Sequence, residues 1–355
     1  MTKKYYDQLD VFRALAALSV CAVHFTYESF FHNYLAEGLF VQLFFTLSGF
    51  VIYLNYSENL NTFQSIQKFI IKRFLRLYPL HLFFLLIFLF IEVAKLYIDI
   101  KYGIEANQPA FERNNIKNFF LNLFFIQHFA EMYNFNSPSW SISVEMMLYI
   151  TFALIVFSFR RFIIYLSFIY VIFFILFTQN KYGAELSIDA YLSGLYSFLI
   201  GCIFCFFLKK NFSFKNHIYD LIFFIFLSIL LLEIFYFEIL NKYNFLYSII
   251  FGLIFYLSFF LNKTYFLYRI FFNKFFVFLG KISYSIYLSH LFIFFMINNF
   301  LRFILKKDTI INNLGIKSLD LTSFEANFYT ILAYFFTVVF SYFTYKYIEI
   351  RFYKK

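Results

Sequence analysis

The first apolar segment of the chain carries two side chains that can do polar chemistry, Arg13 and His24. They are eleven residues apart. At about 100° per residue, this spacing places both on one helix face with an axial separation of about 16 Å. A charge and an imidazole on one stripe of an apolar helix are costly in lipid, and they usually face a protein interior or a water-filled cavity. A plainer interpretation places Arg13 at the headgroup level and His24 in an ordinary polar contact.

Two further stretches with candidate functional residues follow, one within the next apolar segment and one between it and the third. Ser48 and Gly49 form a small pair, for which we prefer close helix packing over a ligand role. Arg73 and Arg76 are three residues apart and share a helix face just before Pro79, which can kink the helix at the membrane surface. Paired guanidinium groups bind phosphate oxygens well, although arginines at helix ends also serve as plain membrane anchors.

Polar groups also lie within two later apolar segments. Trp140 is the only tryptophan of the chain, and it precedes Ser141 and Glu145 at the start of one segment. Tryptophan favours the membrane interface, but a carboxylate about one turn deeper needs a partner or a function. The other segment carries two tyrosines on one helix face and a histidine on the next turn: Tyr284, Tyr287 and His290. These side chains could form hydrogen bonds to neighbouring helices or line a reaction chamber.

The composition is that of a membrane protein. Hydrophobic residues make up 62% of the chain and charged residues 14%, whereas soluble domains have about half apolar and a quarter charged residues. The net charge of +10 would suggest nucleic acid for a soluble protein. Here the basic residues occupy the short connections between apolar segments, where they set topology, so we expect no nucleic-acid partner. Asp10 and Arg13 interrupt the first apolar region, which argues against a cleavable signal peptide.

The pattern predicts an all-α polytopic membrane protein with about ten transmembrane helices, formed by a single domain over residues 1–355 without an extra soluble domain. Basic residues in alternate connections place both termini in the cytoplasm. The apolar stretch 116–130 is short, so we interpret it as re-entrant or interfacial. The connection 301–325 is more basic than this topology favours, although acidic residues offset part of its charge. The predicted spans are 9–30, 38–56, 74–97, 139–158, 161–178, 188–208, 217–237, 244–262, 275–300 and 326–347.

The three cysteines, Cys21, Cys202 and Cys205, all lie within predicted spans. The last two have a two-residue spacing, but no other cysteine or histidine lies close enough in the sequence to complete a metal-binding set. We therefore expect small buried residues and no bound metal.

Taken in order, five motifs resemble the acyltransferase-3 family of membrane acyltransferases: R-x10-H, FF-x-x-SGF, R-x-x-R-L-x-P, WS-x-S-x-E and SY-x-x-Y-L-x-H, over residues 9–352. Each motif is weak alone, but all five occur in the order of the family. The resemblance implies a multi-pass protein of the bacterial cytoplasmic membrane. It also implies transfer of an acyl group, commonly acetyl from acetyl-CoA, to a hydroxyl of a glycan or glycolipid acceptor. Such acceptors include O-antigen, capsule, exopolysaccharide and peptidoglycan.

The resemblance also implies roles for individual residues. Arg13 and His24 match the essential pair of the family, with His24 as the base because an imidazole titrates near neutral pH. Glu145 would orient His24 or act as a second acid or base. Arg73 and Arg76 match an arginine pair suited to the phosphates of coenzyme A, and Arg13 would hold the pantetheine arm or the oxyanion. The residues expected to line the substrate chamber are Ser48, Trp140, Ser141, Tyr284, Tyr287 and His290.

Two positions depart from the pattern of the family. Gln42 is neutral where many members have an acidic residue, and Arg351 stands where many have proline; both changes concern local helix packing more than catalysis. Two alternatives stay open at this point. His24 could itself be transiently acylated, or the chain could be a transporter or flippase for a lipid-linked sugar or acyl donor. The second alternative also uses intramembrane charge, but the chain lacks the paired Gly/Pro-broken spans typical of such proteins.

Overall fold

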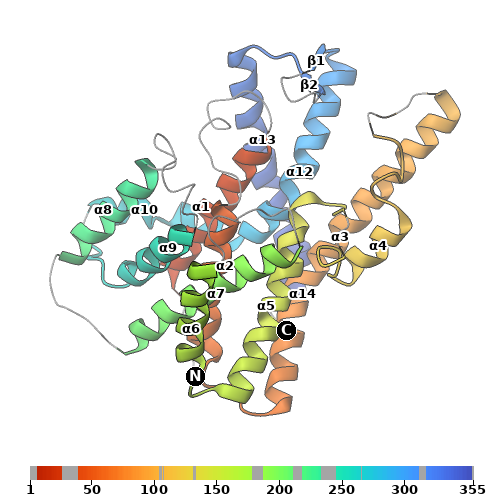
Figure 1. Cartoon of the computed structure of the whole chain (residues 1–355). Helices are drawn as coiled ribbons and strands as arrows, with labels where there is room; N and C mark the ends of the chain where they lie inside the picture. Colours follow the sequence, from red (N-terminus) through yellow and green to blue (C-terminus); the bar gives the residue numbers. More distant parts are fainter. Residues whose placement is uncertain are drawn as a thin grey trace. The chain divides into compact units, whose positions relative to one another are not determined.

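The structure is a computed structural model that describes residues 6–25, 39–103, 106, 108–130, 133–177, 187–210, 218–232, 245–264, 266–311 and 317–353. These residues are almost entirely helical (Figure 1). The chain divides into two compact units. The first comprises Met1–Asn55, Ile164–Asn180 and Tyr196–Phe343, and the second comprises Tyr56–Ile163, Lys181–Leu195 and Thr344–Lys355.

The elements follow one another along the chain as a series of helices with one small hairpin before the last long helix. The helices are α1 (Asp7–His24), α2 (Leu39–Tyr56), α3 (Phe63–Tyr102), α4 (Ile116–Leu123), a 3-10 turn (Ser137–Ser139), α5 (Trp140–Phe159), α6 (Ile163–Phe177), α7 (Ser187–Lys209), α8 (Ile218–Leu232), α9 (Phe245–Ser258), α10 (Phe266–Phe271), α11 (Lys274–Lys281), α12 (Ser283–Asn299) with a π-helical end (Phe300–Ile304), and α13 (Ser323–Thr344), continued by a π-helical segment (Tyr345–Glu349) and α14 (Ile350–Tyr353). The strands β1 (Thr309–Ile311) and β2 (Lys317–Leu319) pair antiparallel, with Thr309 opposite Leu319.

Each predicted span contains a helix, and α11 and α12 share the span predicted at 275–300. The parts of the predicted spans at residues 26–30, 38, 178, 217, 233–237 and 244 lie outside the described residues. Within the described residues, six helical stretches are long and apolar enough to cross a membrane: Leu39–Tyr56, Phe63–Tyr102, Ser137–Phe159, Ile188–Lys209, Ser283–Ile304 and Ser323–Phe352. The full set of about ten spans and the cytoplasmic termini stay predictions.

Helix α3 is longer than the third predicted span, 74–97, and contains all of it. Helix α3 begins at Phe63 rather than near residue 74, because Thr62 and Ser65 form a capping box that satisfies its first amide groups. Arg73 and Arg76 therefore lie within this helix, as their three-residue spacing predicts. The helix also continues through Pro79.

Helix α1 is enclosed by protein in spite of its charged residues. It packs against α11 and α12 (Figure 1). A Cβ atom on Gly280 of α11 would lie 1.9 Å from the carbonyl oxygen of Asp10, so only glycine allows this close approach. Asp10 is buried here and Arg13 and His24 are half-buried, and the expectation that the last two face a protein interior stays a prediction.

The packing interpretation of Gly49 is also confirmed. A Cβ atom on Gly49 of α2 would lie 1.8 Å from the carbonyl oxygen of Phe198 on α7. In return, a Cβ atom on Gly201 of α7 would lie 2.0 Å from the carbonyl oxygen of Thr46 on α2. The two glycines thus let the two helix backbones touch, as small residues do at close crossings of membrane helices.

Replacing Gly49 with leucine should destabilise the first unit, because a backbone carbonyl blocks every position for the new side chain. Overpacking costs about 1–3 kcal/mol even where side chains can move aside, so we expect at least that loss here. The thermal unfolding midpoint of purified protein in detergent measures the effect. Gly103→Asn is the matched control, because Gly103 has positive φ, which asparagine tolerates, and no atom lies within 4 Å of the place that a Cβ atom would take. Equal midpoints for the two variants would contradict the prediction.

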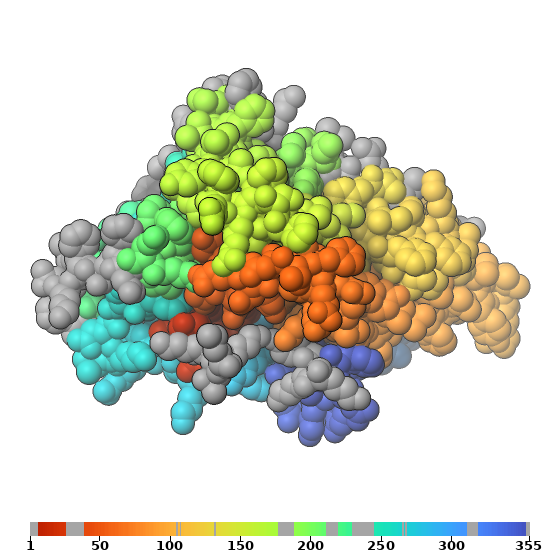
Figure 2. Space-filling model, turned by 90° about the horizontal axis from the view of Figure 1, so that it is seen from below, coloured from red at the N-terminus to blue at the C-terminus, as the bar shows by residue number. Residues whose placement is uncertain are grey.

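In the second unit, the segment after α3 folds back onto that helix. The buried carboxylate of Glu92 accepts hydrogen bonds from Phe111 N at 3.0 Å, Asn114 Nδ2 at 2.9 Å and Lys95 Nζ at 2.8 Å. Figure 2 shows the yellow segment around α4 lying directly against the pale orange end of α3. Helix α4 has only eight residues, fewer than the roughly 20 that a membrane crossing requires.

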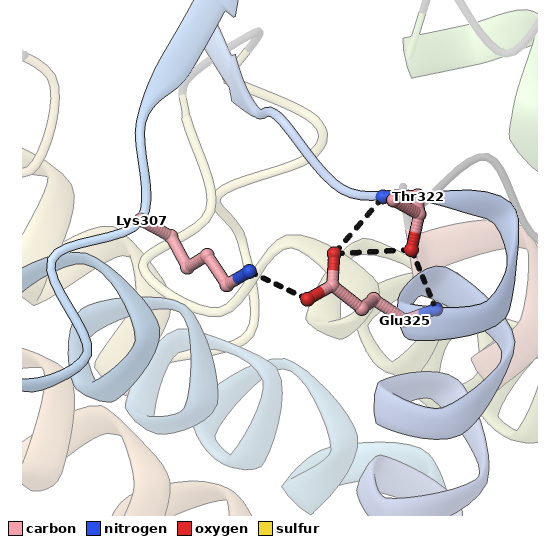
Figure 3. A network of polar contacts seen from close by, with 3 residues as sticks. All are labelled: Lys307, Thr322 and Glu325. Atoms are coloured by element: carbon pink, nitrogen blue, oxygen red, sulfur yellow. Dashed lines mark hydrogen bonds and ion pairs between the residues drawn. The ribbon is translucent and has the colours of Figure 1, made fainter.

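A polar network connects the end of α12 to the start of α13. Lys307 Nζ donates to Glu325 Oε1 at 2.5 Å, and Thr322 and Glu325 cap the first turn of α13 (Figure 3). Lys307 and Glu325 thus offset each other, as expected for part of the charge in the connection 301–325.

Candidate functional site

The first unit brings together two histidines that are far apart in the sequence. His24 ends α1 and His290 lies on α12, and their rings are 5.0 Å apart with an interplanar angle of 50°. The fully buried Phe25 ring packs on both Phe294, at 5.4 Å, and Tyr334, at 5.1 Å. These contacts hold the end of α1 against α12 and α13, and so position the two imidazoles.

The hydrogen bonds of the two rings decide which nitrogen carries the proton. His24 Nδ1 lies 2.9 Å from the carbonyl oxygen of Val20, and His290 Nδ1 lies 3.3 Å from that of Ile286. A carbonyl oxygen only accepts, so in the neutral rings Nδ1 is the donor and Nε2 keeps its lone pair. Each Nε2 is therefore the nitrogen that can accept a proton.

His290 has no exposed surface, and its Nε2 atom has no hydrogen-bond partner among the described residues. Buried polar atoms are nearly always paired, and an exception points to strain, a catalytic role or a bound molecule. An unpaired acceptor beside a second imidazole suits a site that handles protons. Tyr287 lies in the same region, with its ring 6.2 Å from His290 and 5.5 Å from Phe44.

Arg13 has a partner that was not predicted from the sequence. Its Nη1 atom donates to Asp10 Oδ1 at 2.5 Å, and Asp10 is buried while Arg13 is half-buried. The three-residue spacing was the available signal, since such pairs share a helix face. The carboxylate balances the charge of Arg13 within protein and sets the direction of its side chain.

In the second unit, Arg73 is a buried cation within a cage of aromatic rings. Its Nη2 atom donates to Tyr56 Oη at 2.9 Å, and its guanidinium carbon lies 5.1, 5.7 and 5.8 Å from the ring centroids of Tyr56, Phe69 and Tyr149. Its Nε atom has no hydrogen-bond partner, and no carboxylate lies within ion-pair distance among the described residues. A buried guanidinium with spare donors suits an anion.

Arg76 lies in a different environment from Arg73. It forms an ion pair with Glu349, which is buried in the π-helical segment after α13. Glu349 thus balances the charge of a residue on α3 that lies far from it in the sequence. The two arginines are therefore not an equivalent pair, because, among the described residues, a carboxylate balances the charge of Arg76 but not that of Arg73.

Replacing Glu349 with glutamine should destabilise the second unit, because it leaves Arg76 without its buried partner. Arg76 is partly exposed, with 24% of its side chain accessible, so we expect a cost of about 1–3 kcal/mol rather than that of a fully buried pair. Thermal unfolding in detergent measures this change. The double variant Arg76→Gln/Glu349→Gln should recover part of the loss, and Glu112→Gln, at an exposed carboxylate, should change little. No recovery in the double variant would contradict the proposed pairing.

The fourth-span motif lies next to the arginine cage. Glu145 accepts a hydrogen bond from Tyr149 Oη, and the ring of Tyr149 covers Arg73. Ser141 Oγ donates to the carbonyl oxygen of Pro138 at 3.1 Å, within the turn that starts α5. The role of Glu145 toward His24 stays a prediction.

The remaining chamber residues have less definite surroundings. Ser48 and Tyr284 are half-buried on α2 and α12, and their predicted roles stay predictions. The cage residues Tyr56, Phe69 and Tyr149 were not predicted from the sequence. With 64 phenylalanines and 31 tyrosines in the chain, no single aromatic position stood out.

No group of three or more His, Cys, Asp or Glu side chains suited to a metal ion occurs in the part of the chain that the structure describes. The cysteines are buried, as predicted for small packing residues. Cys202 Sγ lies 3.5 Å from the carbonyl oxygen of Gly49, at the crossing of α2 and α7.

Apolar helices of membrane-spanning length, with polar groups buried between them, define an integral membrane protein. A family model described as an acyltransferase domain matches residues 6–346, nearly the whole chain. The chain therefore belongs to the acyltransferase-3 family, and the protein is a membrane acyltransferase. This membership favours acyl transfer over transport. Comparisons with curated proteins and with solved structures gave no match.

Proposed function

We propose that the protein transfers an acetyl group from acetyl-CoA to a hydroxyl of a cell-surface glycan, such as O-antigen, capsule, exopolysaccharide or peptidoglycan. The observation that carries this proposal is the pair of His24 and His290. Their Nδ1 bonds leave Nε2 as the proton acceptor. Transfer of an acyl group to an alcohol needs such an acceptor, because a neutral hydroxyl is a weak nucleophile.

The reaction can be written with the residues of the first unit. His24 Nε2 takes the proton of the acceptor hydroxyl as its oxygen attacks the thioester carbon, which forms a tetrahedral oxyanion. The C–S bond then breaks, the ester forms, and the thiolate of coenzyme A receives the proton from His24. In this proposal Arg13, which donates to Asp10, holds the pantetheine carbonyls of the donor, because the roughly 16 Å along α1 that separates it from His24 is too far for contact with the oxyanion. Transient acylation of His24 is the competing route, and an acyl group isolated on His24 would favour it.

Arg73 supplies the donor side of the proposal. Its guanidinium is caged, buried and without a carboxylate partner among the described residues, so a phosphate of coenzyme A would complete its surroundings. Arg76, on the next turn of α3, would add to the positive potential around this phosphate, although Glu349 balances the charge of Arg76.

We further propose that residues 1–355 form one domain with about ten spans and cytoplasmic termini, in the cytoplasmic membrane of a bacterium. Coenzyme A would then enter from the cytoplasm, and the acceptor would reach the site within the membrane. The basic residues in alternate connections support this orientation.

Mass spectrometry of the surface glycans of the host, with and without this gene, tests the proposal. Loss of one acetyl group per modified sugar in the deletion strain, restored by the gene, is the expected result. Identical glycan masses in both strains would contradict the glycan as acceptor. A mass difference larger than acetyl would keep the reaction and change the donor.

A further inference from the structure

A second group of polar side chains lies in the second unit, where the segment after α4 meets the start of α5. Gln127 Nε2 donates to the carbonyl oxygen of Ser139 at 3.3 Å. The neighbouring residue His128 faces Trp140, with ring centroids 5.3 Å apart and an interplanar angle of 36°. Two adjacent residues of one segment thus contact two adjacent residues of the other, and Trp140 alone among the four was singled out by sequence.

Four buried polar atoms of this group have no hydrogen-bond partner among the described residues: Gln127 Oε1, His128 Nε2, Ser139 Oγ and Ser143 Oγ. Gln127, Ser139 and Ser143 have no exposed surface. Ser139 and Ser143 are four residues apart, so their hydroxyls project from the same side of the helix. An unpaired buried polar group costs about 1–3 kcal/mol, so a cluster of them indicates a place where a complementary molecule binds.

The chemistry of these atoms narrows the class of ligand. The serine hydroxyls both donate and accept, and the amide oxygen of Gln127 accepts. Burial lowers the pKa of His128 below its ordinary value, so the ring is neutral at pH 7. None of the four side chains carries a charge that would suit a phosphate, and an acyl tail would leave all four atoms unpaired. A hydroxyl, which donates and accepts at once, satisfies them.

The half-buried indole ring of Trp140, tilted by 36° against the ring of His128, adds an apolar ring face beside the polar atoms. Such a surface covers the C–H face of a sugar ring while the hydroxyls at its edge reach the buried groups. The combination of a flat ring surface and neutral hydrogen-bonding atoms is that of a carbohydrate site.

We propose that Gln127, His128, Ser139, Trp140 and Ser143 form a binding subsite for a neutral, hydroxyl-bearing sugar ring. The identification of this ring as part of the acyl acceptor rests on the proposed function. Binding of the ring itself does not depend on the proposed function.

Trp140 reports on this subsite directly, because it is the only tryptophan in the chain. Full-length protein in a sugar-free detergent is titrated with methyl hexosides and methyl N-acetylhexosaminides while the indole emission is recorded. Tetrahydropyran, the same ring without hydroxyls, is the matched probe. A saturable change in emission with at least one glycoside, and none with tetrahydropyran, is expected.

The variants Gln127→Ala and Ser143→Ala should each weaken glycoside binding about tenfold, the effect of one lost hydrogen bond of about 1.4 kcal/mol. His128→Phe keeps a ring but removes Nε2, and should weaken binding similarly if either alanine variant fails to fold. Ser258→Ala is the control, because that buried serine already donates to the carbonyl oxygen of Phe255 at 2.7 Å. The control should bind as the unmodified protein does.

No emission change with any glycoside, or unchanged affinity in the folded variants, would overturn the subsite and leave bound water as the partner of these atoms. The proposed function fails differently. A protein that binds glycosides at Trp140 but forms no ester would keep the subsite and overturn the proposed reaction. Conversely, if the Ser143→Ala variant forms the ester with an unchanged KM for the acceptor, the proposed reaction stands and the subsite is overturned.

Discussion

Replacing His24 with alanine is expected to lower acyl transfer about 10³-fold, the size of effect that a positioned general base contributes. The loss follows from the tautomer of His24. Its Nδ1 atom is occupied by the carbonyl oxygen of Val20, so only Nε2 can take the proton of the acceptor, and alanine removes it.

The companion variant His24→Asn separates catalysis from folding. The amide nitrogen of asparagine can still donate to the carbonyl oxygen of Val20, but the side chain offers no proton acceptor at the position of Nε2. We expect equally low activity with nearly unchanged thermal unfolding in detergent. Transfer of a radiolabelled acetyl group from acetyl-CoA to the glycan fraction of membranes measures the activity. Normal transfer by the asparagine variant would remove His24 from the reaction.

Replacing Arg73 with glutamine is expected to raise the KM for acetyl-CoA about 10- to 100-fold, since a hydrogen bond to a charged group contributes about 1.5–3 kcal/mol. The caged guanidinium has no carboxylate partner in the described chain, so its charge is available to a phosphate. The KM for the acceptor should not change. Arg73→Lys should recover only part of the affinity, because an ammonium group lacks the planar fork.

Arg76→Gln is the matched comparison for Arg73, one helical turn away on α3. Because Glu349 already balances Arg76, this variant should lower the thermal midpoint more than it raises the KM for acetyl-CoA. The opposite ranking, with Arg76 controlling donor affinity and Arg73 controlling stability, would contradict the assignment of the anion site to Arg73.

The sequence by itself determined the positions of the helices and the candidate residues of the site. Long apolar runs must satisfy their backbone groups within helices, whatever their neighbours are, so the positions of α2, α5 and α7 followed from hydrophobicity alone. Costly polar residues within such runs, such as His24 and His290, were visible for the same reason. Family membership likewise followed from the order of motifs along the chain.

Only the tertiary structure decided which of these residues meet. The 5.0 Å approach of His24 and His290, the cage around Arg73 and the pairing of Arg76 with Glu349 join residues far apart in the chain. Helical periodicity orders neighbours within about two turns and says nothing of a partner on another helix. The group around His128 stayed hidden because a lone histidine after a short helix carries no periodic signal. This group stands out only in the folded chain, because its polar atoms lack hydrogen-bond partners only after the surrounding protein has excluded water.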